Sequence, residues 1–303
     1  MLLKDLLYKV SLEAVTGSTD VTINKIEFDS RKIEFNDVFV ALKGVNSDGH
    51  NYIDHTINQG AIAVICEVKP LHIVNGVTYI VVKDSHEALA IMASNFYDNP
   101  SKKLKLVGIT GTNGKTTVAT LSYQLFVQAG FKSGLLSTVK IMINQEEHQA
   151  THTTPDSLTI NYYLNQMVEQ GITHCFMEVS SHGIDQKRTH GLHFIGGVFT
   201  NLSHDHLDYH PSFAAYRDVK KSFFDHLDKN SFAITNIDDK NGKLMLQNTN
   251  ATKFTYSIKT LADYKATPIE SEISGTLLKI NEQELWIKLI GKFNIYNVLA
   301  IYG

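Results

Sequence analysis

The segment that most constrains the fold of this 303-residue chain is GITGTNGKTT, residues 108–117. It follows the apolar run LKLVGIT, which predicts a buried strand, and it leads into a helical pattern over residues 115–129. A glycine-rich loop in this setting presents backbone N–H groups, a helix N-terminus and a lysine to a phosphate group. We therefore expect Lys115 to neutralise β- and γ-phosphate charge and Thr116 to reach Mg²⁺.

The loop departs from a standard Walker A sequence, which needs a glycine at the position of Ile109. It is a shorter G-x-x-G-K-T variant. The alternative interpretation is a glycine-rich turn that binds nothing. The strand before the loop, the helix after it and the GKT ending favour phosphate binding.

Strand-like and helix-like runs alternate along the chain, which predicts the α/β class. A polar seam, DNPSKK at residues 98–103, separates a small α/β domain over residues 1–101 from residues 102–303. In the second part the alternation predicts a mainly parallel, doubly wound sheet with helices on both faces. Residues 273–280 and 284–290 predict a hairpin. A helical pattern begins at residue 291 and is unfinished at residue 303, so we expect a fragment of a longer protein.

Composition excludes several classes of protein. Lys and Arg number 28 against 31 Asp and Glu, a formal charge of -3, so no basic surface for nucleic acid is expected. Cys66 and Cys175 lie in separate apolar stretches, which argues against a disulfide framework. The apolar runs are too short to span a bilayer, and Lys4, Asp5 and Lys9 interrupt the N-terminal one. We expect a cytoplasmic protein with no membrane partner.

Glu178 closes a hydrophobic strand in the segment MEVSSHG. In doubly wound sheets ligands bind beyond the carboxyl ends of the strands, so this carboxylate can share a crevice with the phosphate loop and hold a metal ion. The alternative is a surface acid at a strand end. Ser180 and Ser181 do not lie in a G-x-S-x-G sequence, which argues against a serine hydrolase.

The segment TNLSHDHLDYH, residues 200–210, also follows a predicted strand and is rich in metal-ligating side chains. We expect one or two of these to bind a metal ion or phosphate, and the sequence does not select among them. They are His204, Asp205, His206, Asp208 and His210.

The helical pattern over residues 212–227 carries an apolar stripe with a lysine in its middle. The stripe consists of Phe213, Tyr216, Phe223, Phe224 and Leu227. Lys220 lies near its centre and Lys221 to one side. Either the aliphatic chain of Lys220 extends so that its ammonium group reaches solvent, or Lys220 is held in a pocket where burial favours the neutral amine.

The combined motifs resemble those of the Mur ligase family. In chain order the matching segments are GTNGKTT, TTPD (153–156), EVSSHGIDQKR (178–188), NLSHDHLDYH, Tyr216-x-x-x-Lys220, NIDD (236–239) and GKFNIYN (291–297). The match covers nearly all of the chain from residue 105. FDSR (28–31) and GVNSDGHNYI (44–53) are similar, less specifically, to the family's uridine-nucleotide domain. The resemblance implies a third, Rossmann-like domain that these residues lack.

The resemblance implies an ATP-dependent amide ligase of peptidoglycan synthesis. EVSSH with Gln186 and Arg188 is most similar to the members that use UDP-MurNAc-L-Ala-D-Glu. In these, ATP phosphorylates a carboxylate of D-Glu, and a diamino acid attacks the acyl phosphate, releasing ADP and phosphate. The selecting domain is absent, so meso-diaminopimelate and L-lysine both remain as the diamino acid. We expect a monomer.

The resemblance also implies roles for individual residues. The ATP-binding residues it implies are Gly111, Thr112, Asn113, Gly114, Lys115, Thr116, Thr117 and, at the adenine, Asn294. The substrate-binding residues it implies are Phe28, Ser30, Val45, Asn46, Ser47, His152, Thr153, Thr154, Ser180, Gln186 and Arg188. The ligands it implies for two Mg²⁺ ions are Thr116, Glu178, His206 and Lys220 as a carbamate. The residues it implies for catalysis are Lys115, Glu178, His206 and Lys220.

His152 departs from the family pattern, because many relatives have Asn at this position. Two other functions remain open beside the ligase. A metal-dependent phosphohydrolase would use the His/Asp segment but leave GTNGKTT without a role. A non-catalytic nucleotide-binding fragment would bind its ligands and not ligate them.

Overall fold

The computed structural model describes residues 1–44, 47–203 and 209–303. Its contacts divide the chain into two compact units. Unit 1 comprises Met1–Pro100, Asp156–Tyr163 and Gln186–Leu192, and unit 2 comprises Ser101–Pro155, Leu164–Asp185 and His193–Gly303. Two later segments of the chain therefore pack with the first hundred residues.

Unit 1 is built on a five-stranded sheet in the order β1-β5-β4-β3-β2. The strands are β1 (Leu12–Thr16), β2 (Ile26–Glu27), β3 (Val38–Val40), β4 (Ala63–Cys66) and β5 (Thr78–Val82). All neighbours are parallel except β1 and β5. The helices are α1 (Leu3–Leu6), η1 (Ser30–Lys32), η2 (Gly49–Tyr52), α2 (Ile53–Asn58) and α3 (Ser85–Phe96).

The inner strands β3 and β4 of unit 1 are apolar on both sides, as expected for parallel strands covered on both faces. Val38, Val40 and Ile65 face a cluster that includes α1 and α3, whereas Phe39 and Val64 face a second cluster on the other side. Asp84 caps α3 by accepting a hydrogen bond from the Glu87 N–H at 2.9 Å.

Unit 2 contains an eleven-stranded sheet in the order β16-β15-β14-β13-β12-β11-β6-β10-β7-β8-β9. Its strands are β6 (Lys105–Thr110), β7 (Ser133–Leu136), β8 (Lys140–Ile143), β9 (Glu146–Gln149), β10 (His174–Glu178), β11 (Gly196–Phe199), β12 (Phe232–Asn236), β13 (Thr252–Ser257), β14 (Tyr264–Glu272), β15 (Gly275–Ile280) and β16 (Gln283–Ile287). The strands that stand between β14 and β7 in this order, with these two included, pair in parallel. Antiparallel strands extend both edges: β15 and β16 on one side, β8 and β9 on the other.

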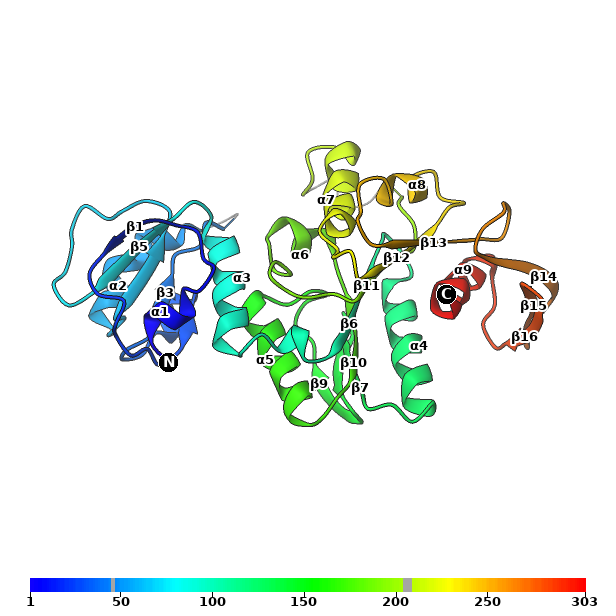
Figure 1. Cartoon of the computed structure of the whole chain (residues 1–303), viewed down its shortest axis with the longest axis horizontal. Coiled ribbons are helices and arrows are strands. Elements are labelled where there is room, and N and C mark those ends of the chain that lie inside the picture. The colour runs from blue at the N-terminus through cyan, green and yellow to red at the C-terminus, as the bar shows by residue number, and fades with distance from the viewer. Residues whose placement is uncertain (45–46, 204–208) are drawn as a thin grey trace. The chain divides into compact units, whose positions relative to one another are not determined.

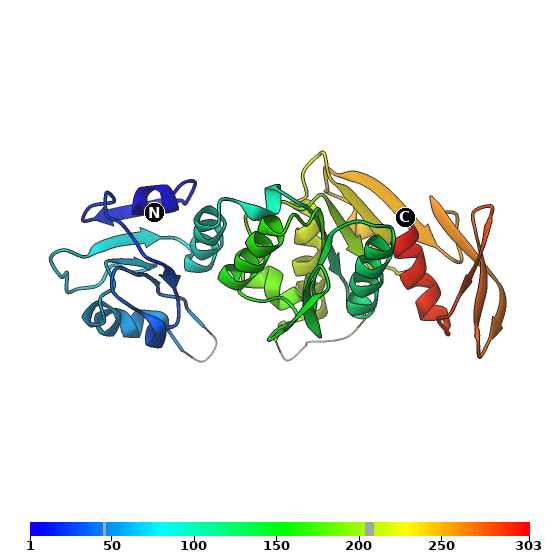
Figure 2. The same ribbon diagram turned by 90° about the horizontal axis from the view of Figure 1, so that it is seen from below.

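Helices cover both faces of this sheet (Figure 1). They are η3 (Pro100–Lys102), α4 (Lys115–Gln128), α5 (Ser157–Glu169), α6 (Ser181–Asp185), α7 (Phe213–Asp225), α8 (Gly242–Met245) and α9 (Lys292–Tyr302). Ile109 and Val198 share a core cluster with residues of α4 and α9. The preceding residue of each strand faces the opposite side, where Gly108 and Gly197 leave room for Phe223 of α7. Figure 2 again shows α9 beside α4.

The α/β class and the parallel, helix-covered sheet of the second part are confirmed. The predicted hairpin near residue 280 is present as β15 and β16. The apolar residues of α4 are not equally buried. Val118 is buried, but Leu125 is 49% exposed, because α4 packs on the sheet mainly through Val118, Ala119 and Tyr123.

Candidate functional site

The glycine-rich loop lies at the carboxyl end of β6 and is fixed by the residues that follow β11. The Thr112 N–H donates to the Asn201 carbonyl at 2.8 Å, and the Thr200 hydroxyl donates to the Asn113 carbonyl at 2.6 Å. Gly111 has φ +146°, and a Cβ there would lie 2.0 Å from the Thr200 hydroxyl. A side chain at this position therefore cannot be accommodated without displacing the loop.

Lys115 is the first residue of α4, so its side chain starts at the helix N-terminus. Its Nζ donates to the carbonyls of Gly111 (2.9 Å) and Thr112 (2.8 Å). The ammonium group is thus held over the loop. The first N–H groups of a helix have no partner within the helix, and together with a lysine they form a site for an anion.

Glu178 ends β10 with a carboxylate that is fully buried. It accepts hydrogen bonds from the Thr116 hydroxyl (3.0 Å), from the Thr138 N–H (2.8 Å) and from the Thr138 hydroxyl (3.1 Å). No ion pair to Glu178 occurs in the described part of the chain. A buried carboxylate supported only by hydroxyl and amide donors is a strong acceptor for a cation.

The segment around residue 154 lies directly beside this carboxylate. The Thr154 hydroxyl donates to the Glu178 carbonyl (2.9 Å) and accepts from the Ser180 N–H (2.9 Å). The hydroxyl of Thr153 is 3.1 Å from that of Thr138. Thr153, Thr154, Ser180 and Glu178 therefore form one cluster next to the loop.

Lys220 on α7 is 1% exposed, so of the two alternatives that its place in the apolar stripe left open, the structure shows the buried one. The Nζ donates to the Gly111 carbonyl at 3.0 Å and lies 4.9 Å from the centre of the Tyr216 ring. The Tyr216 hydroxyl is 3.1 Å from that of Thr112. Lys221 instead forms an ion pair with Asp225 on its own helix.

A cavity of about 610 Å³ opens beside the loop. Its lining residues are Asn113, Gly114, Thr117, Asn201, Asn236, Asp238, Asp239, Phe293, Tyr296 and Asn297. The cavity lies between the first turn of α4, α9 and the end of β12. A space of this size with an aromatic ring, amides and carboxylates next to a phosphate loop suits a nucleoside.

Asp238, which lines the cavity, accepts hydrogen bonds from residues after β13 and from α9. Burial raises the pKa of its carboxyl, but hydrogen bonds from Ser257, the Ile258 N–H and Tyr296 outweigh that effect and lower the pKa below its ordinary value. Burial and the Asp238 hydrogen bond both raise the pKa of the Tyr296 hydroxyl. The pair therefore consists of a carboxylate and a neutral phenol.

Asn294 lies in the first turn of α9 but is not among the residues that line the cavity. Its Nδ2 donates to the Ile290 carbonyl at 2.9 Å, and its Oδ1 accepts from Asn297 Nδ2 at 3.1 Å. Phe293 and Asn297, on either side of it in sequence, do line the cavity. A role for Asn294 at the adenine stays a prediction.

The expected substrate residues are distributed over both units. In unit 1, Phe28 packs against the core and Ser30 begins η1. The Arg188 side chain donates to Gln186 Oε1, at 2.6 and 3.0 Å. Ser47 is exposed, and its carbonyl accepts from the Gly44 N–H. In unit 2, His152 is exposed next to Thr151. Val45, Asn46 and His206 lie outside the described residues.

The donor set fits a magnesium ion at one place. Mg²⁺ prefers oxygen ligands, and the Thr116 hydroxyl and the Glu178 carboxylate supply them at the N-terminus of α4. Within the residues that the structure describes, no group of three or more His, Cys, Asp or Glu side chains could form a metal centre. His204, Asp205, His206 and Asp208 are not among those residues.

Comparison with known proteins identifies the family. Residues 109–303 match the family model described as the Mur ligase middle domain, and residues 22–97 match the model described as Mur ligase family, catalytic domain. The chain belongs to the Mur ligase family. The resemblance of the GTNGKTT and EVSSH segments to Mur ligases is thereby confirmed.

Individual Mur ligases are similar over the whole chain. The UDP-N-acetylmuramoyl-L-alanyl-D-glutamate--2,6-diaminopimelate ligase of Cytophaga hutchinsonii is 54% identical over 100% of this chain and 63% of its own length. That of Bacteroides fragilis is 49% identical, over 100% and 62%. A solved structure of an enzyme with this name has a TM-score of 0.84 at 25% identity, over 99% and 62%. The chain thus spans a little over three fifths of the length of these relatives.

Thr138 is a residue at this site that the sequence did not reveal. It follows β7, the strand beside β10, and so lies at the same edge of the sheet as Glu178. The signal was its position directly after the short run SGLLS, residues 133–137. Because Ser133 and Gly134 begin that run, it was not recognised as a strand.

Proposed function

We propose that the chain is the uridine-nucleotide and ATP-binding part of a ligase that joins a diamino acid to UDP-MurNAc-L-Ala-D-Glu in peptidoglycan synthesis. The observation that carries the proposal is the buried Glu178 carboxylate, hydrogen-bonded to Thr116 of the phosphate loop and to Thr138. The relatives' names supply the substrate and favour 2,6-diaminopimelate over L-lysine.

The first step requires ATP and a carboxylate to be aligned with their charges neutralised. Lys115 holds its ammonium group over the loop, where it meets the β- and γ-phosphates of ATP. The cavity beside Phe293 receives the nucleoside. Thr116 and Glu178 are the residues that would hold Mg²⁺, which would supply further positive charge at the phosphates. The acyl phosphate then loses inorganic phosphate when the amine of the diamino acid attacks.

Lys220 has a separate role in the proposal, as a carbamate that holds a second Mg²⁺. Its burial disfavours the ammonium form, and the neutral amine would add CO₂ and release one proton to give the carbamate anion. The carbamate nitrogen keeps one N–H, which continues to donate to the Gly111 carbonyl. Lysine is suited to this position and arginine is not, because arginine carries a fixed positive charge.

The test uses a full-length chain, made by joining residues 1–303 to the remaining segment of the Cytophaga hutchinsonii relative. ADP formation should depend on UDP-MurNAc-L-Ala-D-Glu together with 2,6-diaminopimelate. Lys115→Ala should abolish it while the far-ultraviolet circular dichroism is unchanged. Release of phosphate from a phosphoester without ATP would instead support the metal-dependent phosphohydrolase.

Lys220 is tested in the same protein. Lys220→Ala should reduce turnover at least 100-fold, and a small carboxylate added to the buffer should restore part of it. Lys220→Arg should not be restored. Normal turnover of Lys220→Arg would show that no carbamate is needed.

Residues 1–303 alone should bind the UDP-substrate and ATP but form no amide bond, because the amine must be delivered to an acyl phosphate shielded from water. Isothermal titration and product chromatography measure the two properties. Amide formation by residues 1–303 would place the amino-acid site within them. The cytoplasmic location and the monomeric state remain part of the proposal. None of the described helices is long and apolar enough to cross a membrane.

A further inference from the structure

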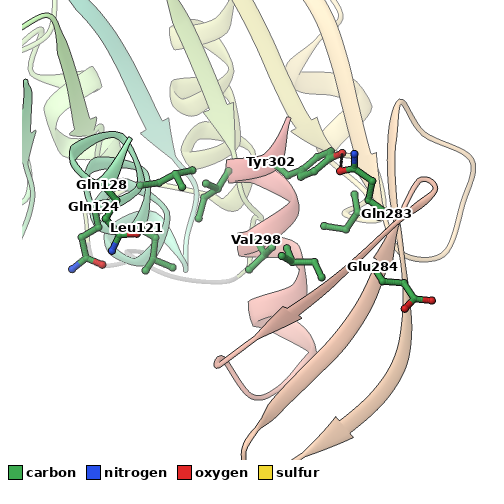
Figure 3. A pocket seen from close by; sticks show the side chains of 11 residues that line it. Leu121, Gln124, Gln128, Gln283, Glu284, Val298 and Tyr302 are labelled. Carbon is green, nitrogen blue, oxygen red and sulfur yellow. Dashed lines mark hydrogen bonds between the residues drawn. The ribbon is translucent and has the colours of Figure 1, made fainter. Parts of the chain in front are cut away.

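An apolar hollow of about 450 Å³ lies in unit 2, away from the phosphate loop. Its walls come from α4, from α9 and from the β15–β16 hairpin. Figure 3 shows Leu121 of α4, Val298 and Tyr302 of α9 and Gln283 of the hairpin around this space. Polar side chains, among them Gln124, line its border. We call this space the α4–α9 groove.

The α4–α9 groove has the pattern of a surface that another helix covers. Leu121 and Leu125 are four residues apart on α4, and Val298, Ile301 and Tyr302 form one face of α9. Leu125 is 49% exposed, although it continues the apolar face of its helix. The apolar residues of α4 and α9, bordered by glutamine side chains, form a surface that fits the apolar face of an amphipathic helix.

We infer that the α4–α9 groove is the docking site of the segment that follows residue 303 in a chain of the relatives' length. The relatives are longer by more than a third of their own length. The model that matches up to residue 303 is that of a middle domain, so the remaining part follows it. Ile301 and Tyr302 themselves line the groove, so the residues that follow them in a longer chain start beside it.

The dimensions of the groove fit this occupant. The groove-lining residues of α4 extend from Leu121 to Gln128, which corresponds to about 10 Å of helix. About two helical turns cover that length. The docking segment should therefore carry apolar residues at spacings of three and four, facing Leu121, Leu125 and Val298.

The first test measures the accessibility of position 125 in two proteins, residues 1–303 and the same residues joined to the remaining segment of the Cytophaga hutchinsonii relative. Both native cysteines are fully buried, so Leu125→Cys provides the reactive thiol. We expect a maleimide to react with it at least 10-fold more slowly in the longer protein. Leu71→Cys, at a position of unit 1 that is 97% exposed, should react equally in both.

Equal rates for Leu125→Cys in the two proteins would overturn the inference. Protection in residues 1–303 that grows with protein concentration would assign the groove to a second copy, and would overturn it as well. Neither result bears on the ligase reaction, so this inference and the proposed function can fail separately.

A second measurement does not depend on labelling. Leu125→Glu should leave the Tm of residues 1–303 within about 1 °C, and should lower that of the longer protein by about 4 °C or more, because it places a charge in a filled groove. The matched control is Gln124→Glu, which adds the same charge to the border of the groove. Equal shifts for Leu125→Glu in both proteins would contradict docking.

Discussion

The support that Thr138 gives to the buried Glu178 carboxylate can be measured directly. Thr138→Val keeps the shape of the side chain and the 2.8 Å N–H hydrogen bond but removes the 3.1 Å hydroxyl bond to Glu178. A hydrogen bond to a charged acceptor contributes about 1.5–3 kcal/mol. Thr138 is exposed, so water replaces part of that contribution. We expect a loss of about 1 kcal/mol in the free energy of unfolding.

Urea unfolding followed by tryptophan fluorescence measures this loss. Trp286 is the only tryptophan of the chain and lies on β16, in the same unit as Glu178. With a denaturant slope of about 2.5 kcal/mol per molar, 1 kcal/mol shifts the midpoint by about 0.4 M. Thr138→Ser retains the hydroxyl and should keep most of the stability. A midpoint for Thr138→Val equal to that of the unmodified chain, or a Thr138→Ser midpoint as low as that of Thr138→Val, would refute the reasoning.

Three further outcomes are expected. The pKa of Asp238 is lower in the folded state than its ordinary value of about 4. Its carboxylate therefore stabilises the fold above about pH 4, and this stabilisation is lost as the pH falls through the folded-state pKa. Between pH 5 and 2.5, the urea midpoint of Asp238→Asn should depend less on pH than the midpoint of the unmodified chain. Gly196→Ala places a Cβ 2.1 Å from the Phe232 ring and should cost about 1–3 kcal/mol, which Phe232→Leu in the same chain should partly restore on thermal melting. Cys66 and Cys175 are fully buried, and burial raises the pKa of the Cys66 thiol to about 11 and that of Cys175 further, so Ellman's reagent at pH 8 should detect two thiols only after denaturation.

Sequence patterns predicted those parts of the site that depend on the local spacing of residues along one segment. The order strand, glycine-rich loop, helix placed Lys115 correctly at the start of α4. The 3.6-residue period placed Lys220 on the buried face of α7, since a helix turns each residue through a fixed angle. Both features depend on local geometry alone.

Features that depend on contacts distant in sequence were not predicted. Thr138 meets Glu178 because β7 and β10 are neighbours in the sheet, and nothing near either residue specifies that pairing. The exposure of Leu125 also escaped prediction, because an apolar stripe on a helix indicates that it packs but not against what. The antiparallel strand β9 is short and polar, so hydrophobic alternation gave no signal for it.

The two contacts from α7 to the glycine-rich loop restrict how this helix can change in evolution. Tyr216 reaches Thr112, and Lys220, one turn later, reaches Gly111. An insertion of one residue between Tyr216 and Lys220 would rotate the second contact by about 100° away from the loop. Insertions and deletions in homologous chains should therefore be found beyond the two ends of α7 and not between these residues, even where the amino acids around them have diverged.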